Sequence, residues 1–128
     1  MNIAQLIQKN SQEFPKDRVF IFNDNPVSFS QLKDTVFALA RGFEKLGICQ
    51  QDKVGIYLPN WPQYLYSYLA LFCLGATIVP LDYMLTEEEV ASCLNHCEAK
   101  FLIAKAKDAT SLGRLKNDIK TLEIIISL

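Results

Sequence analysis

The sequence has little of what several enzyme classes need. Among its 128 residues there is one histidine and there are five glycines. The glycines are Gly42, Gly47, Gly55, Gly75 and Gly113. None are spaced as G-x-G-x-x-G or G-x-x-x-x-G-K-[ST], so neither a dinucleotide site nor a Walker-type phosphate loop is indicated. No serine lies in a G-x-S-x-G turn, and His96 falls within a predicted helix, so a serine nucleophile with a histidine base is not indicated either.

An excess of charge is also missing. The 13 Lys and Arg residues nearly balance the 14 Asp and Glu residues, which gives a formal net charge of -1. The basic residues are scattered along the chain and form no stripe. Because binding to nucleic acid depends on concentrated positive charge, we expect no nucleic-acid partner.

The N-terminus lacks an export signal, since M-N-I-A-Q has no basic region followed by an apolar run. The four cysteines are Cys49, Cys73, Cys93 and Cys97. Without a signal, their thiols are expected to be reduced and the protein to be cytoplasmic.

One stretch, residues 54–81, contains no charged residue and could in principle include a membrane-spanning helix. Its most apolar part, residues 64–79, is shorter than the roughly 20 residues of a spanning helix and is interrupted by Gly75. We therefore expect no transmembrane span here, but a buried helix followed by a buried strand.

Hydrophobic patterning is clear in the first third of the chain. It predicts a helix at residues 3–14 ended by Pro15, a turn at 23–26 between strands at 18–22 and 27–29, and a longer helix capped by Ser30 and closed at Gly47. The apolar stripe of the longer helix consists of Leu32, Val36, Leu39, Phe43 and Leu46. This spacing is typical of one buried helical face.

Strands and helices alternate in the rest of the chain. The expected strands are residues 54–58, 77–80, 101–104 and 122–127, and the expected helices are 61–74 (capped by Asn60), 86–97 (opened by the capping box of Thr86 and Glu89) and 110–117. Such alternation predicts an α/β fold, mainly a parallel sheet with helices on both faces. The N-terminal hairpin would add to one edge of this sheet or pack as a flap.

We interpret residues 1–128 as a single N-terminal subdomain. Residues 1–29 would form a helix plus hairpin, and residues 30–128 the alternating helix and strand layer. The chain finishes on an apolar strand pattern, I-I-I, with no closing helix. We therefore expect the given sequence to be a truncated piece of a natural polypeptide that continues beyond Leu128.

Two groups of side chains raise the question of a metal site. Cys93, His96 and Cys97 share one helical face and could approach a metal ion. Structural zinc takes four ligands, however, and only Cys73 could supply the fourth, so packing is the favoured interpretation. The carboxylates of residues 87–89 fall in a first helical turn, where they complement the helix dipole.

The aromatic residues around position 64 could form a ligand box. Tyr64 and Tyr68 are expected to share a helix face with each other, while Tyr66 points elsewhere and Trp61 precedes them. Packing in the core or at an interface is the favoured use of these rings.

Six short segments follow the order and spacing of one enzyme family. They are residues 27–32 (V-S-F-S-Q-L), 37–43 (F-A-L-A-R-G-F), 46–56 (L-G-I-C-Q-Q-D-K-V-G-I), 57–60 (Y-L-P-N), 74–82 (L-G-A-T-I-V-P-L-D) and 94–103 (L-N-H-C-E-A-K-F-L-I). Together they resemble the N-terminal portion of adenylate-forming (AMP-binding) enzymes of the acyl-CoA synthetase, or long-chain fatty acid–CoA ligase, type. Gln51 stands where that family usually has glycine, and Cys73-Leu74 where lysine-alanine is common.

The resemblance implies a two-step ligation in the parent enzyme. A carboxylic acid, with fatty acids as the first expectation, would react with ATP and Mg²⁺ to give an acyl-adenylate, and the acyl group would then pass to coenzyme A. The family's catalytic elements lie outside the six segments, so the resemblance assigns no catalytic, cofactor-binding or metal residue here. ATP, Mg²⁺ and coenzyme A are expected for the parent, and a non-catalytic scaffold role for these residues.

Other interpretations stay open at this point. The segment could belong to an amino-acid-adenylating domain, or it could be a stand-alone, non-catalytic α/β interaction module. The expected partners are the remaining subdomains of the parent enzyme. Apolar surface that those subdomains would cover also predicts self-association of the isolated chain.

Overall fold

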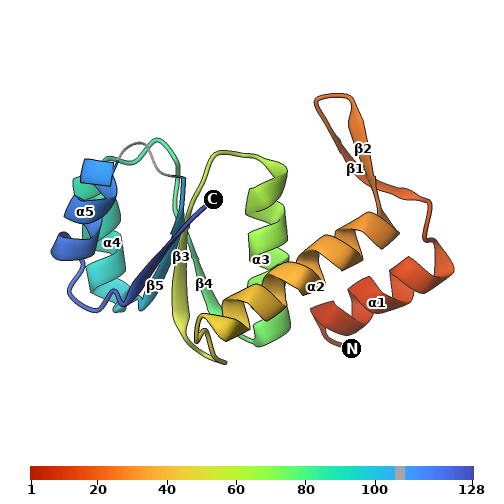
Figure 1. The fold of residues 1–128 in the computed structure, drawn as a ribbon, viewed down its shortest axis with the longest axis horizontal. Helices are drawn as coiled ribbons and strands as arrows, with labels where there is room; N and C mark the ends of the chain where they lie inside the picture. The colour runs from red at the N-terminus through yellow and green to blue at the C-terminus, as the bar shows by residue number, and fades with distance from the viewer. Residues whose placement is uncertain (106–108) are drawn as a thin grey trace.

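A computed structural model describes residues 1–105 and 109–128 (Figure 1). The elements are α1 (Ile3–Glu13), β1 (Arg18–Phe22), β2 (Asn25–Ser28), α2 (Phe29–Lys45), β3 (Lys53–Tyr57), α3 (Pro62–Leu74), β4 (Thr77–Pro80), α4 (Glu87–Cys97), β5 (Phe101–Ala104), α5 (Ala109–Asp118) and β6 (Ile124–Ser127). The α/β class predicted from the alternating pattern is confirmed.

The main sheet has four parallel strands in the order β4-β3-β5-β6. In Figure 1, α2 and α3 lie on one side of this sheet and α4 and α5 on the other. The connection from β4 to β5 passes across β3, and α4 covers that crossover. A parallel sheet with helices on both faces, as expected, is therefore what the chain forms.

The N-terminal hairpin forms a separate sheet. β1 and β2 pair antiparallel with each other, and among the described residues they pair with no strand of the larger sheet. Their turn is tighter than the predicted four residues: Asn23 and Asp24 both have positive φ, 47° and 62°. A two-residue turn of this kind suits the twist of a hairpin, so β2 begins at Asn25 rather than at Val27.

Two hydrophobic cores lie on the two sides of the main sheet. Because side chains alternate along a strand, Val54 and Ile56 of β3 face α2 and α3, while Tyr57 faces α4 and α5. In β5, Phe101 and Ile103 face the first core and Leu102 faces the second, and all are buried. Because helices cover both faces of β5, its side chains are buried on both sides, which explains the unbroken apolar run of this strand in the sequence.

The helix caps correct two expectations. α2 is capped by Ser28, not Ser30, because the Ser28 hydroxyl accepts the Gln31 N–H while the Gln31 side chain accepts the Ser28 N–H. The boundary between hairpin and helix consequently falls between residues 28 and 29. At α3, Trp61 occupies the cap position without a side-chain bond, so Asn60 is not the cap. The capping box of Thr86 and Glu89 is confirmed.

Other boundaries differ by one or two residues from the predicted ones. α1 ends at Glu13, α5 spans Ala109–Asp118, and β6 begins at Ile124 rather than at residue 122. In α2 the predicted stripe is only partly buried: Leu46 is 44% exposed. Leu46 is the C-cap residue and follows the last residue of the helix, so it no longer belongs to the packed helical face.

The uncharged stretch forms a helix and a strand, α3 and β4, separated by Gly75. Gly75 ends α3 in the left-handed conformation, with φ of 69°. α3 is less buried than expected, since Leu65 and Phe72 are exposed. No helix among the described residues is long and apolar enough to cross a membrane.

Candidate functional site

The carboxyl ends of the parallel strands are where open α/β sheets hold ligands. β3 leads into α3 on one face of the sheet, whereas the neighbouring β5 leads into α5 on the other face. The connections therefore diverge between β3 and β5, and a ligand site is expected at this end of the sheet.

A cleft of ≈480 Å³ opens at this end, between the loops that follow β3 and β4. Its lining residues are Leu58, Pro59, Asn60, Tyr64, Pro80, Leu81, Asp82, Tyr83 and Met84. Asp82 is the only one of these residues with a carboxyl or basic side chain, and its Oδ1 accepts the Met84 N–H at 2.9 Å. Burial, and then the neighbouring Tyr68, raises the pKa of Tyr64, so its phenol stays protonated at neutral pH.

The loops around the cleft are anchored by aromatic contacts. The Tyr57 hydroxyl donates to the Leu85 carbonyl oxygen at 2.6 Å, and the Tyr57 and Tyr83 rings lie 5.3 Å apart between centroids. Lys105 Nζ lies 4.2 Å from the Trp61 ring centroid, a cation–π distance. The sequence did not predict these contacts, because each joins separate loops or elements.

The aromatic residues of α3 behave as expected from their spacing. The Tyr64 and Tyr68 rings are stacked at 6.2 Å, and Tyr68 packs edge-on to Phe72 at 4.9 Å. Tyr66 points elsewhere, toward Phe20 of β1, at 6.1 Å. These rings pack against one another and against the hairpin, so packing accounts for them without a ligand.

A second cleft, of ≈550 Å³, lies between α4 and α5. Here Glu87 forms an ion pair with Arg114, with Nε 3.0 Å from Oε2, and also accepts the Ser111 hydroxyl. The acidic first turn of α4 therefore joins two helices in addition to complementing the helix dipole. This use of Glu87 favours a structural role over a metal patch.

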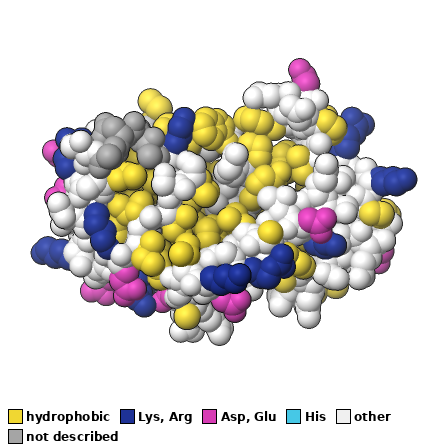
Figure 2. All heavy atoms as spheres, in the orientation of Figure 1, with side chains coloured by type: hydrophobic (Ala, Val, Ile, Leu, Met, Phe, Trp, Pro, Cys, Tyr) yellow, Lys and Arg dark blue, Asp and Glu magenta, His cyan; other side chains and the backbone are white. Residues whose placement is uncertain are grey.

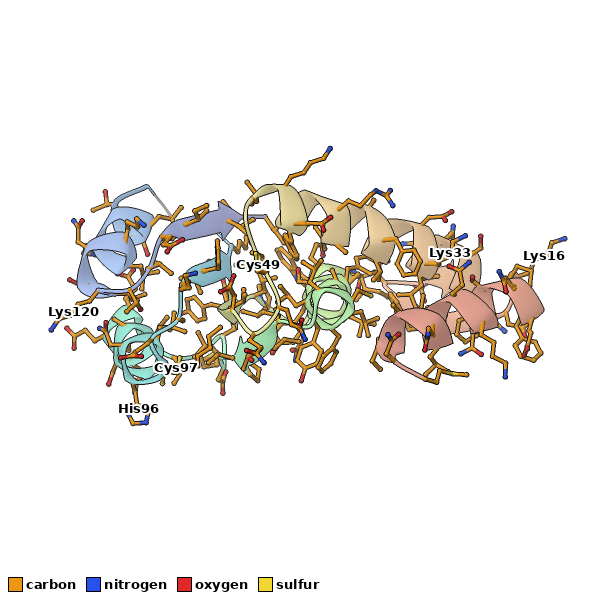
Figure 3. The ribbon with its side chains drawn as sticks, turned by 90° about the horizontal axis from the view of Figure 1, so that it is seen from below. Lys16, Lys33, Cys49, His96, Cys97 and Lys120 are labelled. Atoms are coloured by element: carbon orange, nitrogen blue, oxygen red, sulfur yellow. The ribbon has the colours of Figure 1, made fainter. Side chains whose placement is uncertain are left out.

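The cysteine and histidine candidates do not converge. Figure 3 shows His96 pointing away from the body of the protein, while Cys97 comes from the next position of α4. Cys73 lies on α3, across the sheet from α4, and so cannot supply a fourth ligand. No group of three His, Cys, Asp or Glu side chains in residues 1–105 and 109–128 could hold a metal ion.

Cys73 instead lines a narrow groove of ≈240 Å³ between α2 and α3, opposite Phe37 and Arg41. Burial raises the pKa of the Cys73 thiol. A thiol with a raised pKa in an apolar groove is less nucleophilic at neutral pH, so a catalytic role is not indicated for Cys73.

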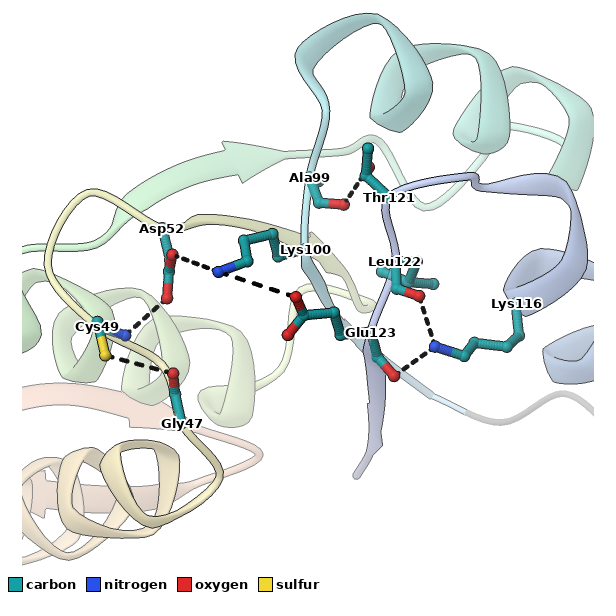
Figure 4. A network of polar contacts seen from close by, with 9 residues as sticks. All are labelled: Gly47, Cys49, Asp52, Ala99, Lys100, Lys116, Thr121, Leu122 and Glu123. Carbon is teal, nitrogen blue, oxygen red and sulfur yellow. Dashed lines mark hydrogen bonds and ion pairs between the residues drawn. The ribbon is translucent and has the colours of Figure 1, made fainter.

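A polar network ties together the amino ends of three strands (Figure 4). Lys100 Nζ lies 3.3 Å from Asp52 Oδ1 and 3.9 Å from Glu123 Oε1, and Asp52 Oδ2 accepts the Cys49 N–H at 2.8 Å. The hydrogen bond and charge of Asp52, followed by the charge of Glu123, raise the pKa of Lys100. The network lies at the opposite end of the sheet from the cleft. It joins the segments that enter β3, β5 and β6, and we call Lys100 with Asp52 and Glu123 the Lys100 clamp.

The family profile of AMP-binding enzymes matches residues 7–128. This chain belongs to the AMP-binding enzyme family. Because the match includes nearly every element of the fold, the resemblance drawn from six short segments is confirmed.

Characterised relatives of this AMP-binding family member are CoA ligases. It is 26% identical over 120 residues to 4-hydroxybutyrate–CoA ligase 2 of Metallosphaera sedula, covering 94% of this chain and 22% of the relative. It is 33% identical over 107 residues to crotonobetaine/carnitine–CoA ligase of Proteus mirabilis, covering 80% of this chain and 21% of the relative. The chain thus spans about a fifth of the length of these relatives.

Solved structures of larger family members contain the same fold. A Mycobacterium tuberculosis fatty acyl CoA synthetase superposes with a TM-score of 0.88 at 21% identity, over 99% of this chain and 26% of that one. A long-chain-fatty-acid–CoA ligase from Archaeoglobus fulgidus superposes with a TM-score of 0.89 at 21% identity, over 100% of this chain and 27% of that one. The expectation of an acyl-CoA-synthetase-like fold is confirmed.

The AMP-binding signatures of this chain coincide with caps and turns. Ser28 caps α2, Asp52 closes the turn before β3, and Gly75 ends α3 with positive φ. Gln51 has φ of 69°, a left-handed conformation that explains why the family usually has glycine there. These signatures therefore have structural reasons within this chain.

Proposed function

We propose that residues 1–128 act as one N-terminal scaffold subdomain of an ATP-dependent acid–coenzyme A ligase, and that none of them acts in catalysis. The observation that carries this proposal is the position of the family signatures, which lie at caps and turns such as Ser28 and Gly75. Among the described residues, the lining of the cleft at the carboxyl end of the sheet contains no Ser, Cys, Lys or His.

The described residues do not fit Mg²⁺ and ATP by themselves. The cleft offers one carboxylate, Asp82, and its lining includes no glycine-rich loop whose N–H groups could hold phosphates. We therefore assign ATP, Mg²⁺ and coenzyme A to the remaining subdomains of a parent ligase, which are the partners we propose for this chain. A reduced, cytoplasmic setting is part of the same proposal, and the four free cysteines agree with it.

The reaction proposed for the parent is the formation of a CoA thioester. A carboxylate displaces pyrophosphate from ATP to give an acyl-adenylate, and the thiol of coenzyme A then displaces AMP. The printed acids of the relatives include 4-hydroxybutyrate and crotonobetaine or carnitine, and two of the superposed proteins are named for fatty acids. These names support a carboxylic acid that is not an α-amino acid as the substrate, with a fatty acid as our first choice.

A chimera tests this function. Residues 1–128 would replace the aligned segment of the Proteus mirabilis ligase, which shares 33% identity over 107 residues. We expect the chimera to form its CoA thioester, and the same ligase without any N-terminal segment to be inactive. A matched chimera carrying Phe43→Ala, which empties a buried core position, should lose thermal stability and activity together. A chimera that melts like the parent ligase yet lacks ATP–pyrophosphate exchange would contradict a pure scaffold role.

A further inference from the structure

Two of the four cysteines lie on the same side of α4. Cys93 and Cys97 are four positions apart at the end of this helix, and both are free thiols. Residues spaced in this way are neighbours on a helix surface, with about 5–6 Å between their Cβ atoms. Cys97 packs against the second core, whereas Cys93 is exposed. Packing therefore explains at most one of the two thiols.

The Cys97 sulfur is directed toward the turn that contains Cys93. Its S–H group donates to the Leu94 carbonyl oxygen at 3.6 Å. Side chains on a helix lean toward its N-terminus, which brings the end of the later side chain of such a pair toward the earlier one. The two thiols therefore share one stretch of helix surface, and this stretch is open to solvent at Cys93.

The helix keeps these thiols too far apart for a disulfide but not for a bridging ion. A disulfide needs about 3.5–4.5 Å between the Cβ atoms, which is less than the about 5–6 Å of this spacing. Two metal–sulfur bonds of about 2.3 Å each separate two sulfurs by about 4.6 Å when the bonds lie in line. An ion held between two thiolates therefore matches the spacing of the helix.

The surroundings restrict the ion to one that two ligands satisfy. His96 points away from the body of the protein (Figure 3), and no group of three His, Cys, Asp or Glu side chains in the described part of the chain could hold a metal. Structural zinc requires four ligands, and hard cations require oxygen ligands, so neither is matched by this pair. Thiolates favour soft cations, and among these Cu⁺ accepts two ligands in line.

We propose that Cys93 and Cys97 form a two-thiolate site for a soft monovalent cation, represented by Cu⁺. On binding, the two S–H protons leave to solvent and two Cu–S bonds form. Copper enters as Cu⁺ and remains Cu⁺, so no electron is transferred. Because protons are released, the affinity should rise with pH. The proposal goes beyond the ligase assignment and does not depend on it.

The end of α4 that carries the pair is fixed before an ion arrives. The Asn95 side-chain N–H donates to the Asp118 carbonyl oxygen at 2.8 Å, and the Asn95 side-chain oxygen accepts the Lys120 N–H at 2.9 Å. Leu94, which follows Cys93, is fully buried. A site on a helix that is already held in place loses little conformational freedom when the ion binds.

The pair also lies on a polar part of the surface. Ser92 and His96, its neighbours on α4, are both exposed. Figure 2 shows charged side chains of both signs around the end of the molecule formed by α4 and α5, whereas apolar side chains gather over the middle of the view. An exposed polar surface of this kind gives an ion a path to the two thiols.

The first experiment titrates Cu⁺ into the protein without oxygen, with a reductant that contains no thiol, in competition with a chromophoric copper chelator. A reference variant carries Cys49→Ser and Cys73→Ala, so that only the pair on α4 remains. This variant should bind one Cu⁺ per chain. Adding Cys93→Ser should weaken binding at least roughly tenfold, because even the loss of an outer-shell partner costs metal sites that much. Unchanged affinity without Cys93 overturns the proposal.

A matched control separates the spacing of the thiols from their number. Adding Ser92→Cys together with Cys93→Ser to the reference variant keeps two cysteines on α4 but places them five positions apart, off a common helix face. This variant should bind Cu⁺ as weakly as the protein that retains Cys97 alone. Full recovery of the affinity would overturn the proposal, because any two thiols on this surface would then suffice.

The second experiment uses the wild-type chain and does not require any variant to fold. One equivalent of Cu⁺ is added, the thiols are alkylated with iodoacetamide, and the modification of each cysteine is measured by mass spectrometry over time. Bound Cu⁺ should slow the alkylation of Cys93 several-fold, while Cys49, which is also exposed, should react at an unchanged rate. Equal slowing at Cys49 and Cys93, or no slowing at Cys93, overturns the proposal.

Discussion

The two sides of the main sheet are covered by helix layers of different character. On one side, α4 and α5 carry no large exposed hydrophobic residue among those described, and Glu87 and Arg114 join them by an ion pair. On the other side, α3 has no charged residue in its 13 positions, and Leu65 and Phe72 are 36% and 43% exposed. The α4/α5 layer is suited to water, whereas the α3 layer has the composition of a surface that a further layer covers.

The largest expected effects come from emptying the two cores. Phe43→Ala on the α2/α3 side should cost about 3–5 kcal/mol and Leu94→Ala on the α4/α5 side about 2–5 kcal/mol, since both side chains are buried. If both cores stabilise one cooperative unit, each variant will show a single thermal transition at a lower temperature. Two separate transitions in either variant would mean that the two sides of the sheet unfold independently.

Glycine-to-alanine changes should have opposite signs on the two sides. Gly75, at the end of α3, has φ of 69°, and an added Cβ would lie 3.1 Å from Gln50 Cγ, so Gly75→Ala should destabilise by about 1–2 kcal/mol. Gly113 in α5 has open space around the same position, so Gly113→Ala should stabilise by about 0.5–1 kcal/mol. Urea unfolding measures the free energy of unfolding of both variants. Equal effects of the two changes would contradict the assigned difference between the left-handed Gly75 and the helical Gly113.

Two buried serines provide a matched pair. The Ser67 hydroxyl of α3 is fully buried and has no hydrogen-bond partner among the described residues, so Ser67→Ala should stabilise the fold by about 1 kcal/mol. The buried Ser111 hydroxyl of α5 donates to Glu87, so Ser111→Ala should destabilise by a similar amount. Thermal melts of the two variants suffice, and a loss of stability in Ser67→Ala would show that its hydroxyl has a partner.

The turn before β3 offers a smaller stabilising change. Gln51 adopts a left-handed conformation, and its N–H donates to the Gly75 carbonyl oxygen at 2.9 Å. Gln51→Gly removes roughly 1–2 kcal/mol of backbone strain from the folded state. It also increases the conformational entropy of the unfolded chain, which costs about 0.5–1 kcal/mol on folding. A net increase in the free energy of unfolding of about 0.5–1 kcal/mol is therefore expected. Gln51→Ala, which keeps the strain, is the control, and equal stabilities of the two variants would contradict the backbone explanation.

The smallest effect is the pH dependence of the Lys100 clamp. The pKa of Lys100 is raised from 10.5, mainly by its hydrogen bond to Asp52, so the folded state holds this proton more tightly than the unfolded state. The contribution is therefore fully present below pH 10.5 and is lost as pH rises through the higher folded-state pKa. The stability difference between wild type and Lys100→Met should be constant near neutral pH and shrink in strong alkali. A difference that grows with pH would reverse the assigned sign.

Local signals in the sequence predicted much of this fold. The capping box of Thr86 and Glu89 predicts the start of α4, and Gly75 predicts the end of α3. The unbroken apolar run of β5 predicts a strand that is covered on both faces. The sequence also contains a signal for the cap of α2, because Ser28 and Gln31 have capping-box spacing, whereas Ser30 lies within the helix.

Contacts between distant residues could not be predicted in this way. Asp52 and Lys100 are 48 positions apart and meet only because β3 and β5 pair in a specific register. The contact of Lys105 with Trp61 likewise depends on which loops share one end of the sheet. The cleft has the same origin, since the strand order that brings the loops after β3 and β4 together is not encoded in any local pattern.

ATP–pyrophosphate exchange by the purified 128-residue chain tests the central claim most directly. The assay would contain Mg²⁺, ATP and fatty acids of several chain lengths, with the Proteus mirabilis ligase and its own acid as the positive control. A scaffold subdomain without catalytic residues predicts no exchange above that of buffer. Exchange that scales with the concentration of the chain and persists through repurification would contradict the account, because it would place an adenylating site within these residues.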